Sequence, residues 1–258
     1  MSGSTAARSH DAPVIDLYLG GDLGGWTLGQ VGDTRIHSVF SYDDDILDAA
    51  RTCSQRTDRD PPDPRHVETG SVAVCVHYPR VFSAALIARY GVMYNLHPGY
   101  LPWGRGYYPV FWALWEQTPA GATLHEIVPA LDKGPIVMQI RVRQYPYDTG
   151  GSLHERVRRA EREIFRQVWP KILGGDRPPT RPAPPEKGSY HSKADFVALR
   201  EHADVGALSG GQLLRLVRAL TFPGLPGLQV DLGGRLFHLS LEELQEGRTA
   251  ADPGRLQA

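Results

Sequence analysis

Cysteine is scarce in this sequence. Its 258 residues include only Cys53 and Cys75, and neither forms a Cys-x-x-Cys pair or stands near histidines at the spacing of zinc ligands. We therefore expect no metal site and no redox role for either thiol. A chain of this length can bury a substantial core without disulfide bonds or a structural metal.

Long apolar runs and an excess of charge of one sign are also missing. No apolar stretch approaches the roughly 18 to 20 residues that cross a membrane, and the first residues lack the apolar segment of a secretory signal. A cytoplasmic protein with no membrane partner is the expectation. The formal net charge of −1 provides no general basic field for tRNA or DNA, so we predict no nucleic-acid partner. The arginine-rich run at 156–162 is interpreted as the solvated face of a helix.

Hydrophobic patterning predicts strands that alternate with helices, which is typical of an α/β domain with a mainly parallel, Rossmann-like sheet. Extended segments are expected at 13–19, 35–41, 71–78, 92–97, 121–128 and 135–145. Helices are expected at 43–52, 83–91 and 150–174, and after Pro109. The glycine-rich segment 20–26 is predicted to be a turn with little room for a helix, and the polar, proline-rich segment 53–70 to be a loop.

A proline-rich segment at 174–188 marks a boundary in the chain. We predict a disordered N-terminus at 1–10, the main α/β domain at 11–175, a connector at 176–188 and a small C-terminal α+β unit at 189–258. That unit is expected to contain helices near 193–203 and 209–220 and a hairpin over 229–240. Its apolar helix could serve an internal core or a homodimer contact.

Asn95 and His97 are the candidate chemical groups. Residues two apart on a strand share a face, and Pro98 ends the strand, so the pair is expected at the carboxyl edge of the sheet, where ligands bind. An asparagine amide can stabilise an oxyanion, and a histidine can accept and release a proton near pH 7. Asp132, in a turn before Gly134, is the candidate anion that orients the imidazole. Taken alone, the pair is weak support, because many histidines in turns only cap the backbone.

The surrounding motifs resemble those of the formyltransferases that use 10-formyltetrahydrofolate. The resemblance rests on NLHPGYLPWGRG at 95–106 and GATLHEIVPALDKGPIVMQ at 121–139. It covers about residues 71–140, including the order Asn-x-His-Pro, the Gly-x-Thr-x-His segment and the Asp-x-Gly-x-Ile-x-x-Gln segment. The family includes enzymes acting on glycinamide ribonucleotide, methionyl-tRNA and nucleotide-linked amino sugars.

This resemblance implies transfer of a formyl group to a primary amine without a metal or a covalent enzyme intermediate. Asn95 would donate to the formyl oxygen, His97 would polarise or protonate that oxygen, and Asp132 would hold His97 and help to accept the amine proton. The folate would be bound by two segments that also qualify as ordinary core at strand ends. These segments contribute Tyr78, Arg80, Val81, Phe82, Ile127, Val128 and Pro129.

The acceptor is less well defined by sequence. Arg105, Tyr107 and Trp112 are candidate acceptor-binding residues, although Arg105 could instead pair with a carboxylate and the aromatic residues could be core. The chain length and the segment GSYHSKADF at 188–196 resemble the nucleotide-sugar N-formyltransferases, whose acceptors are commonly dTDP-linked. His125 is interpreted as a buried, hydrogen-bonded histidine in preference to a catalytic one.

Other functions stay open at this point. The amine could belong to another small molecule of a specialised pathway, because the start of the domain departs from the family pattern. Attack by water would make a formyltetrahydrofolate hydrolase. A catalytically silent folate- or nucleotide-binding module is a further alternative, which the intact trio of Asn95, His97 and Asp132 disfavours.

Overall fold

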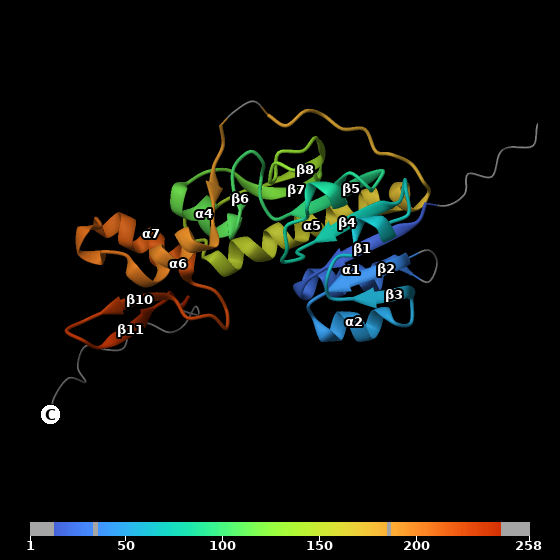
Figure 1. The fold of residues 1–258 in the computed structure, drawn as a ribbon. Helices are drawn as coiled ribbons and strands as arrows, with labels where there is room; N and C mark the ends of the chain where they lie inside the picture. The colour runs from blue at the N-terminus through green and yellow to red at the C-terminus, as the bar shows by residue number, and fades with distance from the viewer. Residues whose placement is uncertain (1–12, 33–35, 185–186, 244–258) are drawn as a thin grey trace, which may run out of the picture.

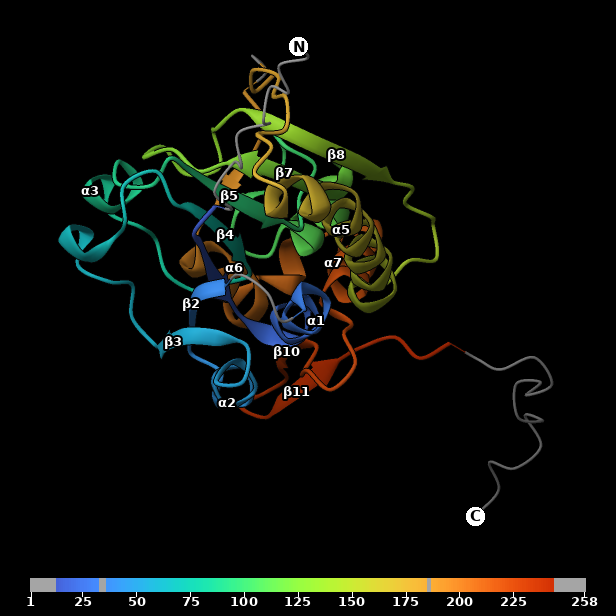
Figure 2. The same cartoon turned by 90° about the vertical axis from the view of Figure 1, so that its right-hand side faces the viewer.

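The computed structural model describes residues 13–32, 36–184 and 187–243; the predicted disordered N-terminus lies outside them. The main sheet contains β1 (Ile15–Leu19), β2 (Ile36–Ser41), β3 (Ser54–Asp58), β4 (Val72–Val76), β5 (Val92–His97), β7 (Ala120–Glu126) and β8 (Ile136–Val142). Their order across the sheet is β3-β2-β1-β4-β5-β7-β8 (Figures 1 and 2). The first five strands in this order pair in parallel, and β7 and β8 join antiparallel. The predicted α/β class with a mainly parallel sheet is confirmed.

Two apolar layers cover the sheet. On one face, side chains such as Leu17, Val74 and Leu96 pack against α1 (Gly21–Val31), α2 (Asp44–Ala50) and α5 (Gly150–Leu173). On the other face, Tyr18, Met93 and their neighbours pack under α3 (Ala84–Ile87). Because side chains alternate along a strand, Asn95 and His97 lie on the face of Met93, which the long helix α5 leaves uncovered.

The helix α1 corrects the prediction of a turn after the first strand. Glycine in a helix interior costs roughly 1 kcal/mol relative to alanine, which is why the sequence disfavours a helix here. The structure compensates by burying Leu23, Leu28 and Val31. A Cβ on Gly24 would lie 3.1 Å from the Leu19 side chain and 3.2 Å from that of Ile46. This glycine therefore lets α1 approach the sheet and α2 closely.

The segment predicted as a loop at 53–70 contains the edge strand β3 and the 3₁₀ helix η1 (Pro64–His66). The strand has the polar sequence SQRTD, and most of its side chains are exposed. Its position is fixed by parallel backbone pairing with β2 and not by an apolar face. Hydrophobic periodicity therefore gave no signal for it.

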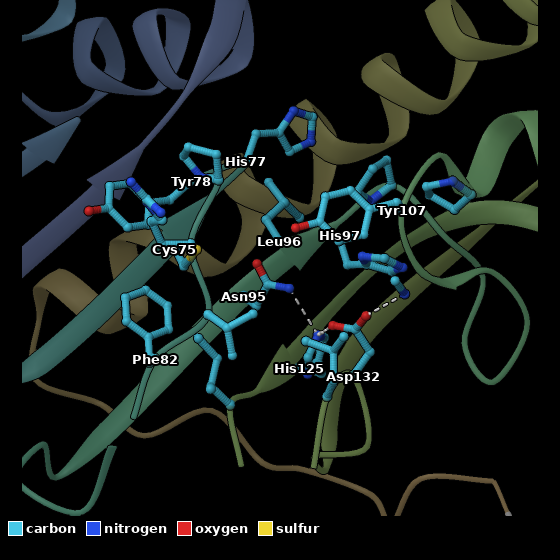
Figure 3. Close-up of a pocket in the computed structure, with 18 of the residues that line it drawn as sticks. Cys75, His77, Tyr78, Phe82, Asn95, Leu96, His97, Tyr107, His125 and Asp132 are labelled. Carbon is cyan, nitrogen blue, oxygen red and sulfur yellow. Dashed lines mark hydrogen bonds and ion pairs between the residues drawn. The ribbon is translucent and has the colours of Figure 1, made fainter. Parts of the chain in front are cut away.

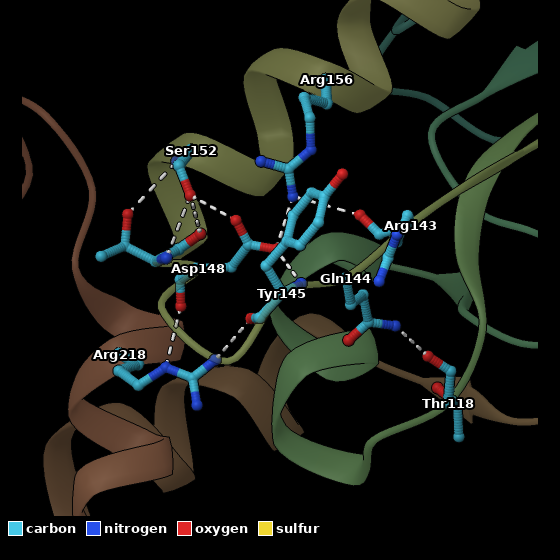
Figure 4. Close-up of polar contacts among 9 residues, drawn as sticks. Thr118, Arg143, Gln144, Tyr145, Asp148, Ser152, Arg156 and Arg218 are labelled. Carbon is cyan, nitrogen blue, oxygen red and sulfur yellow. Dashed lines mark hydrogen bonds and ion pairs between the residues drawn. The ribbon is translucent and has the colours of Figure 1, made fainter.

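The arginine run on α5 is more than a solvated face. Arg156 forms an ion pair with the fully buried Asp148, which also accepts hydrogen bonds from the Tyr145 amide and the Ser152 hydroxyl (Figure 4). Burial would raise the pKa of Asp148, but Arg156 and these donors lower it overall. Arg218 donates to the Asp148 carbonyl. The network attaches the start of α5 to the C-terminal unit.

The C-terminal unit shares a core with the main domain. It contains α6 (Lys193–His202), η2 (Val205–Ala207), α7 (Gly210–Leu220) and the predicted hairpin of β10 (Leu228–Asp231) and β11 (Leu236–Leu239). Buried Leu216 and Leu220 of α7 belong to one cluster with Leu153 of α5 and with α4 (Pro109–Glu116). The apolar side of α7 thus packs inside the chain.

The described parts of the connector, which follow α5 and precede α6 in the chain, lie over the main domain (Figure 1). Arg181 and Ile136 exchange backbone hydrogen bonds of 2.9 and 2.8 Å. Further along, β9 (Tyr190–His191) pairs in parallel with β6 (Arg105–Gly106). Two points of backbone pairing therefore join the chain between α5 and α6 to the sheet and to the loop after β5. Across all the described residues, no helix combines the length and apolar character needed to cross a membrane.

Candidate active site

A cavity of about 410 Å³ opens at the carboxyl ends of β4 and β5. Asn95, His97 and Asp132 all line it, together with His125 (Figure 3). β5 ends at His97 as Pro98 predicts, and the pair on this strand shares one face. The three groups singled out from the sequence are therefore brought together around one cavity.

The buried imidazole of His97 has a defined tautomer. Its Nε2 lies 2.8 Å from the carbonyl oxygen of Gly104. A carbonyl can only accept a hydrogen bond, so Nε2 carries the hydrogen and donates. Burial lowers the pKa of His97 below its usual value, against the opposing effect of Asp132. A neutral ring with this tautomer keeps Nδ1 as a proton acceptor.

Asp132 acts on His97 electrostatically, whereas its direct contacts are elsewhere. Oδ2 accepts a hydrogen bond of 2.8 Å from the Gly106 amide, and Oδ1 lies 3.5 Å from Nε2 of His125. This corrects the expectation that the carboxylate holds the imidazole of His97. Burial would raise the pKa of Asp132, but His97, His125 and Gly106 lower it well below its usual range. The carboxylate is ionised near neutral pH.

His125 positions the amide of Asn95. Its Nδ1 donates to the Glu126 carbonyl at 2.8 Å, and its Nε2 lies 3.2 Å from Asn95 Nδ2 (Figure 3). The same Nε2 lies 3.5 Å from Asp132 Oδ1, so the ring lies between the asparagine amide and the carboxylate. The structure agrees with the interpretation of His125 as buried and hydrogen-bonded, and adds a direct contact with the predicted oxyanion donor.

The turn that carries Asp132 depends on a close backbone approach. Asp132 has a positive φ of 52°. Two residues later, a Cβ on Gly134 would lie 1.7 Å from the Glu126 carbonyl oxygen. Glu126 also donates its amide to the Pro135 carbonyl at 2.8 Å. Only glycine fits at 134, and the turn that it permits returns the chain from β7 to β8 past the site.

The residues predicted for the folate all line the same cavity. Tyr78, Arg80, Val81 and Phe82 follow β4, and Ile127, Val128 and Pro129 follow β7. The Tyr78 and Phe82 rings stack at 5.8 Å with an interplanar angle of 8°. The Arg80 guanidinium lies 5.0 Å from the Tyr42 ring centroid. Flat aromatic and aliphatic walls with few charges suit a heteroaromatic ring.

Only one of the three predicted acceptor residues lines the cavity. Tyr107 does so, and it is exposed. The Arg105 guanidinium instead donates to the carbonyls of Ser189 and Lys187. Trp112 faces the core between α4 and α7, where its ring stacks on His191 at 3.6 Å. Helical spacing placed Trp112 near the loop but could not give the direction of its side chain.

His77 is a lining residue that the sequence analysis missed. It adopts a positive φ of 55° directly after β4. Its Nε2 lies 2.7 Å from the fully buried carboxylate of Glu161, and its Nδ1 lies 3.3 Å from Arg158. Its partners are 81 and 84 residues away in sequence, so no local pattern indicates them.

Cys75 also lines the cavity. Burial raises the pKa of its thiol to about 12, so the side chain is not a thiolate at neutral pH.

Comparison with known proteins identifies the family. Residues 49–169 match the family model described as formyl transferase. A dTDP-4-amino-4,6-dideoxyglucose formyltransferase from Mycobacterium tuberculosis is 32% identical over 170 residues, which cover 66% of this chain and 71% of that protein. The chain belongs to the formyl transferase family. It is accordingly a formyltransferase, as the resemblance of its motifs predicted.

Solved formyltransferases share the fold. A 4-N formyltransferase from Francisella tularensis is 21% identical, with a TM-score of 0.76 over 90% of this chain and 98% of that one. A formyltransferase from Anoxybacillus kamchatkensis, solved with UDP-4,6-dideoxy-4-formamido-L-AltNAc and tetrahydrofolate, is 27% identical. It has a TM-score of 0.51 over 68% of this chain and 96% of that one. The first comparison extends well beyond the residues of the family model, into the C-terminal part of this formyltransferase.

Proposed function

We propose that this formyltransferase transfers the formyl group of 10-formyltetrahydrofolate to the amino group of a nucleotide-linked amino sugar, with dTDP as the carrier. The observation that carries the proposal is the convergence of Asn95, His97 and Asp132 on the cavity that the predicted folate segments line. The relative from M. tuberculosis is named for a dTDP-linked amino sugar. The relative from A. kamchatkensis was solved with a nucleotide-linked formamido sugar and tetrahydrofolate.

The folate supplies the formyl carbon that the amine attacks. We assign to Asn95 the hydrogen bond to the formyl oxygen as negative charge develops there, with His125 fixing its amide. His97 accepts the proton of the attacking amine at Nδ1, because burial keeps the ring neutral and Gly104 occupies Nε2. The Asp132 carboxylate stabilises the imidazolium that forms. The proton then passes to N10 of the folate as the bond from N10 to the formyl carbon breaks.

The walls of the cavity support a folate subsite. The volume of about 410 Å³ falls in the range of small-molecule sites. Stacked Tyr78 and Phe82 supply aromatic surface, while Ile127 and Val128 supply aliphatic surface on the other segment. We assign Tyr107 to the acceptor side, because it extends from the loop after His97 and is exposed.

Binding measurements distinguish the candidate acceptors. Calorimetric titration with 5-formyltetrahydrofolate, a stable analogue, would be followed by titration with dTDP, UDP and GDP. We expect the folate analogue to bind and dTDP to bind more tightly than the other two. Folate binding without any nucleotide response would contradict the sugar acceptor and favour another amine.

Four expectations from the sequence stay predictions: a cytoplasmic location, a homodimer, the lack of a nucleic-acid partner and the domain limits at 175 and 188.

A further inference from the structure

We propose that residues 187–191, which we call the strap, are a positioning element of the active site, and that Ser189 is its positioning residue. The strap spans the end of the connector and the start of the C-terminal unit, and it touches the loop after β5 from outside the cavity. The inference rests on the proposed formyl transfer. The strap acts on the backbone groups that are hydrogen-bonded to His97 and Asp132, and it is not proposed to contact the substrates.

The loop at 104–106 holds both titratable groups of the proposed mechanism through its backbone. The Gly104 carbonyl accepts the hydrogen bond of His97 Nε2 at 2.8 Å. The Gly106 amide donates to Asp132 Oδ2 at 2.8 Å. A shift of this loop would therefore change the orientation of the imidazole and the position of the carboxylate together.

The strap binds this loop at successive residues. The Gly104 amide donates to the Ser189 hydroxyl at 2.9 Å. Because the carbonyl of the same glycine accepts from His97, Gly104 links Ser189 to His97. The Arg105 amide donates to the Ser189 carbonyl at 3.1 Å, and the Tyr107 amide donates to the His191 carbonyl at 2.9 Å. Ser189 also donates its own amide to the Pro102 carbonyl at 3.2 Å. Of these four hydrogen bonds from backbone amides, only the one to the Ser189 hydroxyl involves a side chain, so substitution of Ser189 can remove it alone.

Two glycines allow the strap and the loop to approach each other closely. A Cβ on Gly106 would lie 2.3 Å from the His191 carbonyl oxygen, and a Cβ on Gly188 would lie 2.0 Å from the Pro102 carbonyl oxygen. Both glycines have positive φ, 86° and 59°. His191 also stacks on Trp112 and contacts Glu116 at 2.7 Å, which attaches the end of the strap to α4. The strap is thus fixed on both sides of Ser189.

The test compares Ser189→Ala with Ser192→Ala. Ser192 lies three residues further on, and its hydroxyl caps α6 through Asp195 without touching the loop. We expect Ser189→Ala to lower kcat by about 10- to 100-fold, the scale of a small misplacement of catalytic groups, with a smaller change in KM. The acid limb of its pH profile should move to lower pH, because the Gly104 carbonyl favours the protonated imidazole. Ser192→Ala should keep the kcat of the wild type.

Hydrogen exchange provides a readout that does not need activity. In Ser189→Ala, the amides of 103–107 should exchange faster than in the wild type, while those of the main sheet should not change. Unchanged exchange at 103–107 would overturn the proposal, as would a wild-type kcat in a folded Ser189→Ala or an equal loss in Ser192→Ala. If the wild type transfers no formyl group, the proposed function fails, and the exchange result alone decides on the strap.

Discussion

At the scale of single residues, the proposed chemistry depends on different environments for two titratable groups. His97 is buried and held neutral, whereas Asp132 is buried but stays ionised because two imidazoles and an amide surround it. A neutral acceptor beside a fixed anion can take up a proton and stabilise the cation that results. The amide of Asn95 completes the set without a charge of its own.

Substitution of each group tests its assignment. Asn95→Ala, His97→Ala and Asp132→Ala should each lower kcat by at least about 100-fold, as losses of oxyanion donors and acid–base groups do. The rates would be measured beside thermal melting, to show that each variant folds. Tyr147→Ala is the matched surface control, because this side chain is 74% exposed and lies outside the cavity lining. A wild-type rate in folded His97→Ala would contradict the mechanism.

The pH dependence of kcat/KM follows from the same residues. His97 must be neutral to accept a proton, and its pKa lies below the usual 6.5 or so. Activity should therefore be constant just above neutral pH and fall as the pH drops through this lowered pKa. Rate measurements across the acid range, with an NMR titration of the imidazole, check the sign. An acid limb above pH ~6.5 would contradict the assigned state of His97.

At the scale of elements, the sequence predicted what periodicity and chain-breaking residues determine. β5 ends before Pro98, and α5 follows its apolar recurrences. It did not predict α1, whose helix depends on packing against the sheet, or β3, whose edge pairing requires no apolar side chains. The meeting of Asn95, His97 and Asp132 at one cavity could be predicted, because two short sequence motifs contain them. The Glu161 partner of His77 could not, because helix packing brings it there from a distant segment.

Two glycines provide an element-scale prediction. Gly134→Ala should destabilise the fold by about 1–3 kcal/mol or more, because the added methyl group would collide with the Glu126 carbonyl. It should also lower kcat by displacing the turn of Asp132. Gly29→Ala is the control: it lies on α1 with open space around it and should stabilise the protein by up to about 1 kcal/mol. Denaturant unfolding measures both, and a neutral Gly134→Ala would contradict the close approach.

At the scale of the whole molecule, the C-terminal unit and the main domain share one apolar cluster. The α7 helix packs on α4 and α5, and the strap pairs with the loop at 104–106. Two units that bury a common core are expected to unfold together. The sequence indicated a boundary at the proline-rich connector, but it contained no signal for the packing across that boundary.

Unfolding of α7 variants tests this shared core. Leu216→Ala, at a fully buried position, should cost about 2–5 kcal/mol and lower a single thermal transition of the whole protein. Leu214→Ala, on the same helix at a side chain 53% exposed, should change stability by less than about 0.5 kcal/mol. Differential scanning calorimetry would show the difference. Two separate transitions, with only one shifted by Leu216→Ala, would mean that the units unfold independently.

The most direct measurement of the central claim is a product assay with formyl-labelled 10-formyltetrahydrofolate and a dTDP-linked amino-deoxysugar, analysed by mass spectrometry. We predict that the wild-type protein moves the label to the amino sugar. The folded His97→Ala variant should do so at least about 100-fold more slowly. An unmodified amino sugar in the presence of folded wild-type protein that binds both compounds would contradict the account, and so would label released only as formate.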